Sequence, residues 1–186
     1  MPGLEDLYRE IILDHYRNPR NRGELESPPA LRAEGFNPLC GDEIVVYLAV
    51  DGDVITDVKI AGQGCSISQS SASMMSAAVK GKTVAQARST IKAFRAMMSL
   101  HGRALDGAGD GPAGDGLIAD RRGLGAADSQ GAEDELSGPE VAAAEGVALG
   151  DLEALQGVVK FPVRIKCATL SWHTLAQALD EAAARA

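Results

Sequence analysis

Apolar side chains recur with helical spacing at the start of the chain. They fall at positions i, i+3, i+4, i+7 and i+8, namely Leu4, Leu7, Tyr8, Ile11 and Ile12. Glu5 and Asp6 lie in the first turn, where the helix dipole favours negative charge. The pattern predicts an amphipathic helix that ends before Pro19, because a proline disfavours helical geometry in the residue that precedes it.

A second stretch has the alternating spacing of β-strands. Residues 43–50 are rich in Ile, Val and Tyr, Asp51-Gly52 is a hairpin turn signal, and apolar and polar residues alternate over 57–60. We therefore expect an antiparallel hairpin with one buried face. A further short extended segment is expected near residues 32–36, which gives a small antiparallel sheet of about three strands.

Two more helices are predicted after the hairpin. Residues 66–79 contain no Gly or Pro, and Gly81 follows as a stop signal. Thr83 and Gln86 have the spacing of a capping box, after which apolar residues repeat every three or four positions as far as Gly102. A small sheet packed against several helices defines an α+β fold.

The rest of the chain divides into a low-complexity segment and a C-terminal helix. Residues 102–150 are rich in Gly, Ala and Asp and bury too little apolar surface to offset the entropy of ordering. We interpret 102–150 as a mobile insertion within a single domain that spans residues 1–186. Order is expected to resume over 152–163, and a helix follows with one apolar face at Ala168, Trp172, Leu175, Leu179 and Ala182. Cys167 is expected where that helix begins.

Charge and composition exclude several classes of protein. The formal net charge of the 186 residues is -8, whereas nucleic-acid binding relies on clustered Lys and Arg. No cationic N-terminus precedes an apolar run, and no apolar run approaches the length of a membrane span. We expect a soluble cytoplasmic protein that binds neither nucleic acid nor membrane. In a reducing compartment its three cysteines are free thiols or metal ligands.

Four residues with metal-binding chemistry lie at predicted element boundaries, in a loop before a strand or at a helix start: Cys40, Asp42, Cys65 and Cys167. Gly41 and Gly64 stand beside them and permit a close approach of the backbone. A helix N-terminus would lower the pKa of Cys65 and of Cys167 and favour the thiolate. Spacing alone leaves the alternative open that these cysteines are small buried hydrophobes, because no CxxC pair is present.

Other candidate ligands and cations are less distinctive. His15, His101 and His173 lie on predicted helices distant in sequence from the cysteine loops, so we interpret all three as surface or packing residues. Three thiolates and a carboxylate around a divalent metal leave two negative charges. Arg164 or Lys166 would offset that charge or orient an incoming sulfur; the alternative is that each is a solvated surface cation.

Four segments resemble the motifs of IscU-like iron–sulfur cluster assembly proteins: HYRNPRN at 15–21, NPLCGD at 37–42, GQGCSIS at 62–68 and RIKCA at 164–168. The resemblance covers residues 4–82 and 152–179 and implies the α+β fold of that family. Within the family the chain is more similar to the SufU type. Lys166 stands where IscU proteins carry a histidine ligand, and an insertion separates the second and third cysteines.

The resemblance implies a zinc site made by Cys40, Asp42, Cys65 and Cys167. It further implies a sulfurtransferase-type accessory protein that accepts persulfide sulfur from a PLP-dependent, SufS-like cysteine desulfurase and serves downstream cluster-assembly or acceptor proteins. Cys40 would be the sulfur acceptor, since a loop thiol beside Gly41 is able to leave the metal, and Arg164 would assist as a cation. Two alternatives remain: a scaffold that assembles and transfers a transient iron–sulfur cluster, and a zinc-stabilised interaction module.

Overall fold

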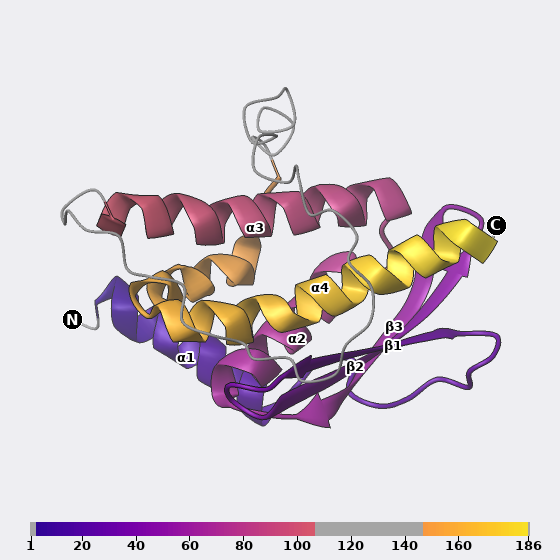
Figure 1. Cartoon of the computed structure of the whole chain (residues 1–186), viewed down its shortest axis with the longest axis horizontal. Coiled ribbons are helices and arrows are strands. Elements are labelled where there is room, and N and C mark those ends of the chain that lie inside the picture. Colours follow the sequence, from indigo (N-terminus) through magenta and orange to yellow (C-terminus); the bar gives the residue numbers. More distant parts are fainter. Residues whose placement is uncertain (1–2, 107–146, 186) are drawn as a thin grey trace, which may run out of the picture.

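The computed structural model describes residues 3–106 and 147–185 and contains a three-stranded sheet with helices packed on one face (Figure 1). In chain order the elements are α1 (Leu4–Arg17), β1 (Leu31–Asn37), β2 (Asp42–Asp51), β3 (Val54–Gln63), α2 (Ser66–Val79), α3 (Val84–Asp106), the 3-10 helix η1 (Gly150–Lys160) and α4 (Pro162–Arg185). The predicted α+β class is confirmed, as are the opening helix, the hairpin and the helices that follow it.

The sheet is antiparallel with strand order β1-β2-β3. Leu31 pairs with Leu48 at one end of the β1–β2 ladder, and Asn37 pairs with Asp42 at the other. A two-residue turn follows Asp51, and its Gly52 has φ +58°, a left-handed conformation that glycine adopts without strain. Burial alternates along β1, so one face of the sheet meets the helices and the other faces solvent.

Helices α2 and α4 cover the inner face of the sheet. Helix α4 packs against β1 and β2, and α2 packs against β3 and α4. Trp172 of α4 is fully buried, stacks on Phe94 of α3 with ring centroids 4.4 Å apart, and donates a hydrogen bond from Nε1 to Ser71 Oγ. Because Ser71 Oγ also donates to the carbonyl of Ala168, a polar contact ties α2 to α4 within an otherwise apolar core.

Helix α3 begins as the sequence predicts. Thr83 Oγ1 accepts from the amide of Gln86, and Gln86 Oε1 accepts from the amide of Thr83, so the capping box is confirmed. The helix continues past Gly102 to Asp106. Residues 107–146, which make up most of the predicted insertion, lie outside the described part of the chain. Beyond them, the segment expected to be ordered from residue 152 is the 3-10 helix η1.

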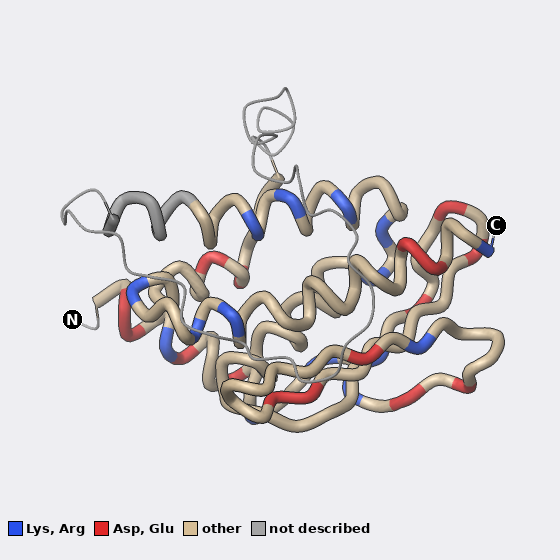
Figure 2. Tube along the Cα trace, viewed as in Figure 1, with Lys and Arg blue, Asp and Glu red and all other residues tan. Residues whose placement is uncertain are grey.

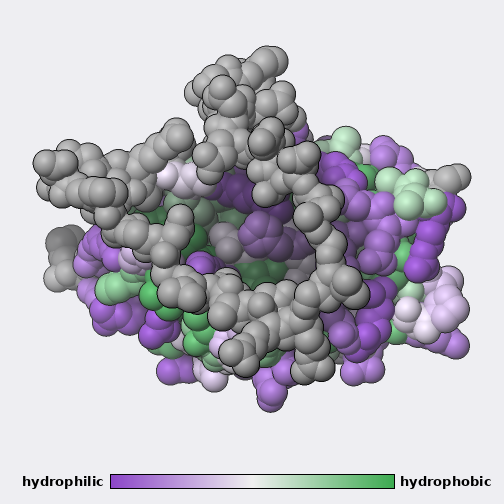
Figure 3. All heavy atoms as spheres, viewed as in Figure 1, coloured by the Kyte–Doolittle hydropathy of each residue, from purple (hydrophilic) through white to green (hydrophobic). Residues whose placement is uncertain are grey.

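The surface carries charges of both signs, interspersed along the helices and the sheet (Figure 2). Ion pairs between exposed side chains link neighbouring elements, as Arg88 of α3 does with Asp180 of α4 at 2.8 Å. Pairs of this kind contribute about 0–1 kcal/mol each. Apolar residues also appear on the viewed face among polar ones (Figure 3). Within the two described ranges, no helix is long and apolar enough to cross a membrane.

Candidate metal centre

The loop between β1 and β2 carries the first cysteine. Asn37 and Asp42 form the last pair of the ladder, and the carbonyl of Asn37 accepts from the amides of Cys40 at 3.3 Å and Gly41 at 2.8 Å. Gly41 has φ +69°, and a Cβ there would meet nothing within 4 Å. Glycine therefore suits position 41 because of its left-handed backbone conformation, and not because a side chain would lack room. The turn leaves Cys40 exposed.

Asp42 joins this loop to the start of α2. Its carboxylate is fully buried, and Oδ1 accepts a 2.8 Å hydrogen bond from the amide of Cys65. A Cβ on Gly64 would lie 2.6 Å from Asp42 Oδ1, so only glycine permits this approach. The prediction that Gly64 allows a close backbone approach is confirmed.

Cys65 is the N-cap of α2, as the sequence predicts. Its Sγ accepts from the amide of Ser68 at 3.4 Å, and it lies 3.8 Å from Asp42 Oδ2. The sulfur is half-buried. The N-cap position lets the sulfur satisfy one of the amides that lack a partner within the helix.

Cys167 does not lie at a helix start, and this prediction is wrong. Helix α4 begins at Pro162, so Cys167 is in the second turn, where backbone amides are already paired within the helix. Its side chain is fully buried, with Cys40 Sγ 3.1 Å away and the Asn37 amide nitrogen 3.7 Å away. Pro162 itself was the available signal, because proline favours the first helical position.

The electrostatics of Cys167 also differ from the prediction. Burial raises the pKa of the Cys167 thiol well above its usual range, and hydrogen bonds with Cys40 and Asp42, with the nearby negative charges, raise it further. The expectation that a helix dipole lowers this pKa is therefore wrong. A cation at the site reverses the balance, because a bound metal stabilises the thiolate directly and displaces the proton.

The four residues named from the sequence converge at one end of the sheet. One ligand atom each from Cys40, Asp42 and Cys167 lies within 4.8 Å of the other two. Cys65 borders this group through its contact with Asp42. Zinc bonds of about 2.0–2.3 Å to sulfur and oxygen require ligand atoms at such separations, and thiolate-rich sets with a carboxylate suit a tetrahedral zinc. The donor set thus fits zinc.

The candidate cations are two residues of the first turns of α4. Arg164 and Lys166 are both exposed. Arg164 precedes Cys167 by three residues, so the two lie on neighbouring positions of the helix surface. Arg164 also lines a groove of about 560 Å³ that includes Ile67 and Phe161. No cysteine lines this groove, so Arg164 is not part of the buried cluster.

Two of the three histidines lie within the described side chains, and neither contributes to the cluster. His15 is buried, with Nδ1 2.8 Å from Ser73 Oγ and Nε2 3.3 Å from Asp151 Oδ2, which confirms a packing role. His173 is exposed beside Arg95, and partial burial and the neighbouring cation lower its pKa. The side chain of His101 lies outside the described residues.

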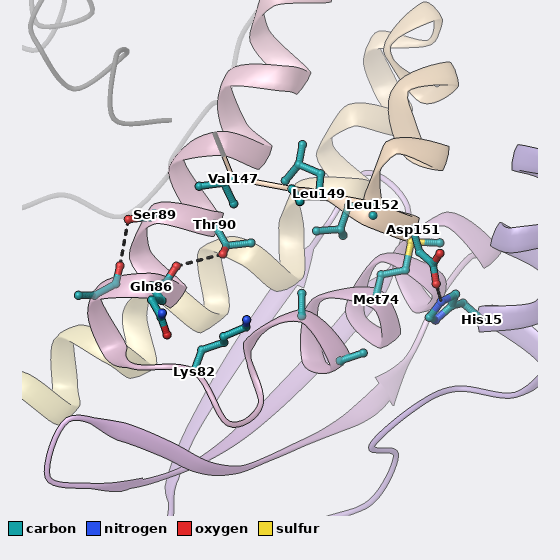
Figure 4. Close-up of a pocket in the computed structure, with 15 residues that line it drawn as sticks. His15, Met74, Lys82, Gln86, Ser89, Thr90, Val147, Leu149, Asp151 and Leu152 are labelled. Atoms are coloured by element: carbon teal, nitrogen blue, oxygen red, sulfur yellow. Dashed lines mark hydrogen bonds and ion pairs between the residues drawn. The ribbon is translucent and has the colours of Figure 1, made fainter. Parts of the chain in front are cut away.

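A larger cavity lies apart from the thiols. It has a volume of about 820 Å³ between α2, α3 and the segment that enters η1, and Met74, Lys82, Gln86 and Leu149 line it (Figure 4). The contact between His15 and Asp151 closes one side of it (Figure 4). None of the three cysteines, all of which the structure describes, lines this cavity.

Asn37 is the residue of the site that sequence analysis missed. It is buried, its Nδ2 donates to Cys167 Sγ, and its Oδ1 accepts from the amide of Leu39 at 3.2 Å. The contact with Leu39 had a signal in the sequence, because an asparagine before proline is typical of a turn that the side chain stabilises. The contact with Cys167 had none, since 130 positions separate the two residues.

Comparison with known proteins defines the class. Residues 7–108 match the NifU-like N-terminal domain, and the chain belongs to that family. It is 41% identical over 172 residues to the zinc-dependent sulfurtransferase SufU of Bacillus subtilis (strain 168), covering 92% of this chain and 88% of the relative. It is also 33% identical over 180 residues to the scaffold protein IscU of Streptococcus pyogenes serotype M1, covering 97% and 87%. The resemblance to IscU-like proteins is confirmed.

Solved structures agree with the assignment. A structure described as a cluster assembly scaffold protein for the SUF system, from Fervidobacterium islandicum AW-1, superposes with a TM-score of 0.60 at 29% identity and covers 95% of this chain and 99% of its own. A nitrogen-fixing NifU-like N-terminal protein from Brucella abortus has a TM-score of 0.61 at 22% identity, over 98% and 99% of the two chains, and shares the fold.

Proposed function

We propose that this chain is an iron–sulfur cluster assembly protein that carries zinc and accepts sulfur from a PLP-dependent cysteine desulfurase of the SufS type. The observation that carries the proposal is the unequal exposure of two neighbouring thiols. Cys40 is exposed on a turn, whereas Cys167, 3.1 Å away, is fully buried. A sulfur acceptor must be accessible, and a ligand that retains the metal need not be. The similarity to the Bacillus subtilis sulfurtransferase supports the same conclusion.

The proposed zinc ligands are Cys40, Asp42, Cys65 and Cys167. Zinc, when bound, supplies a positive charge that keeps the thiols deprotonated and stabilises the fold around them. The protein's contribution is to fix three of the donors: Asp42 by burial and by the Cys65 amide, Cys65 by its place at the N-cap, and Cys167 by the core of α4. Cys40 alone belongs to a loop.

The sulfur step uses Cys40 as the nucleophile. Its thiolate attacks the outer sulfur of the desulfurase persulfide and forms a new S–S bond. The S–S bond within the desulfurase persulfide breaks, and its electron pair stays on the desulfurase cysteine, so the step needs no external oxidant or reductant. Arg164, exposed one helical turn before Cys167, would offset the negative charge that develops among the thiolates.

A scaffold role for a transient iron–sulfur cluster is the second candidate, and the likeness to IscU proteins favours it. Thiolates ligate iron as well as zinc. The two roles differ in what occupies the site: a scaffold builds a cluster on the donors, whereas a sulfur-transfer protein keeps its zinc. A third candidate, a zinc-stabilised interaction module, would need the metal but no accessible Cys40.

Metal analysis combined with a desulfurase assay separates the three candidates. We expect anaerobically purified chain to hold about one zinc and to accelerate sulfide release by a purified SufS-type desulfurase. Cys40→Ala should abolish acceleration, and Asp42→Ala should lose zinc. Cluster absorbance after reconstitution without any acceleration would support the scaffold instead. Zinc binding with full acceleration by Cys40→Ala would refute Cys40 as the acceptor, and zinc binding without acceleration by the wild type would leave only the interaction module.

A further inference from the structure

Two chemically identical thiols at this site have different surroundings, and one residue contacts the thiol of Cys167 and the backbone of the turn that carries Cys40. Asn37 lies at the end of β1, where the residue is 6% exposed. It reaches Cys167 with its amide nitrogen and the Cys40 turn with its oxygen atoms.

The orientation of the Asn37 amide follows from its neighbours. The backbone amide of Leu39 is only a donor, so the atom 3.2 Å from it must be the oxygen Oδ1. This leaves Nδ2 as the donor 3.7 Å from Cys167 Sγ. The contact with Cys167 is buried, and the contact with Leu39 is part-buried. A buried amide without a partner would cost about 1–3 kcal/mol, which favours retention of the bond to Cys167.

The bond to Cys167 lowers the reactivity of that sulfur. An N–H donor withdraws electron density from a thiolate, fixes its orientation toward a metal and weakens it as a nucleophile, as hydrogen bonds to ligand sulfurs do in general. The remaining contacts act on the other thiol. The Asn37 carbonyl accepts from both Cys40 and Gly41, and its Oδ1 holds Leu39, so the whole turn is anchored at its base while the Cys40 side chain stays exposed.

We infer that Asn37 is a positioning residue that gives the two thiols different roles: its amide keeps Cys167 as the fixed ligand, and its oxygens hold the turn that presents Cys40 as the thiol that reacts. The inference rests on the proposed function for the identity of the reaction. It adds that the choice between Cys40 and Cys167 depends on one residue of β1, through its side-chain amide at Cys167 and through its side-chain and backbone oxygens at the Cys40 turn. Exposure of Cys40 does not by itself prevent Cys167 from reacting with the persulfide, because movement of the turn would leave Cys167 unprotected.

Two substitutions separate the two halves of this role. Asn37→Asp keeps an oxygen for the Leu39 amide but has no donor for Cys167. Asn37→Ala removes both contacts without adding charge. Asn18→Asp is the matched control, because it makes the same chemical change at an exposed residue at the end of α1. Circular dichroism of all three variants checks that they fold.

The measurements are zinc release to a chromophoric chelator and alkylation by iodoacetamide, mapped to each cysteine by mass spectrometry. Both Asn37 variants should release zinc about tenfold faster than wild type, a typical effect of removing a partner of a metal ligand. Both should gain alkylation at Cys167, and Asn37→Ala alone should also gain it at Cys40. After reaction with the desulfurase, wild type should carry its persulfide on Cys40, and the variants should divide it between Cys40 and Cys167.

Three results would overturn the inference. One is that both variants release zinc at the wild-type rate and show the wild-type pattern of alkylation. Another is faster release in Asn37→Asp alone, since the added charge would then be the cause. The third is an equal rise in alkylation of all three cysteines, which indicates general loosening. Alkylation of the metal-free chain is measured in parallel. If wild type binds no zinc, the proposed function fails, and the metal-free map still decides whether Asn37 protects Cys167.

Discussion

The two sides of the metal centre differ in how the fold holds them. On one side Asp42 and Cys167 are fully buried, and each is fixed by hydrogen bonds to another element. On the other side Cys40 sits on a four-residue connection whose glycine adopts φ +69° with open space around it. The difference indicates that Cys40 is able to move without disturbing the core, whereas Asp42 and Cys167 are part of the core.

Removal of the buried Cys167 thiol is expected to have the largest effect on the difference between the two sides. Cys167→Ser should lose tight zinc binding and lower the free energy of unfolding by about 1–3 kcal/mol, because the stability linked to metal binding is lost. Cys40→Ser should keep the wild-type melting temperature in the metal-free form and lose sulfur transfer. Thermal unfolding and zinc titration check both variants. Equal destabilisation by the two substitutions would contradict the division.

Gly64→Ala tests whether the buried side depends on close packing. The new methyl group would lie within 2.6 Å of Asp42 Oδ1, so we expect a loss of about 1–3 kcal/mol and weaker zinc binding. Urea unfolding and competition with a chelator measure the two effects. Gly157→Ala is the control, because a Cβ there meets nothing within 4 Å. A Gly64→Ala protein with wild-type zinc affinity would show that Asp42 is not held by this contact.

Arg164→Ala removes the exposed cation one helical turn before Cys167. Arg164 is exposed, so its removal should change stability by less than about 0.5 kcal/mol. We expect sulfur transfer to slow by about tenfold, because the charge among the thiolates loses its counterion. Lys166→Ala serves as the matched control on the same helix. Desulfurase assays at low and high salt check the result, and a similar slowing in both variants would point to general steering by positive charge.

The smallest effect is expected at an ion pair away from the site. Lys80 Nζ lies 2.7 Å from Asp57 Oδ1, and its hydrogen bond lowers the pKa of the Asp57 carboxyl below the ordinary value of 3.8. The stabilisation is complete above that ordinary value and is lost as the pH falls through the lowered pKa. Lys80→Gln should therefore reduce stability at pH 7 by up to about 1 kcal/mol, with less difference at pH 3 and no change in zinc binding.

Periodicity was enough to predict most of the fold. The spacing of apolar residues located α1, α2 and the β2–β3 hairpin, and the capping box located the start of α3. These signals act over a few residues, and the tertiary structure agrees with them in these segments. The boundaries near Cys167 were wrong because η1 and α4 follow each other with a single residue between them, and apolar spacing alone does not separate two such helices.

The site was predicted less completely than the fold. Motif resemblance identified Cys40, Asp42, Cys65 and Cys167, and the structure brings them to one end of the sheet. Their unequal burial was not predictable, because it depends on how α4 packs over β1 and β2. The contact of Asn37 with Cys167 also depends on how α4 packs over β1 and β2. A pairing across 130 positions leaves no trace in local spacing.

The packing of Trp172 also gives the protein an internal optical probe. The chain has one tryptophan, so all indole fluorescence comes from this fully buried ring on the helix that carries Cys167. Its ring lies flat against Phe94, and its N–H is bonded to Ser71, so shifts of α4 relative to α2 or α3 change its emission. A shift of α4 on metal loading would therefore be observable by emission spectroscopy in the unlabelled wild-type chain, in real time and without a chelator.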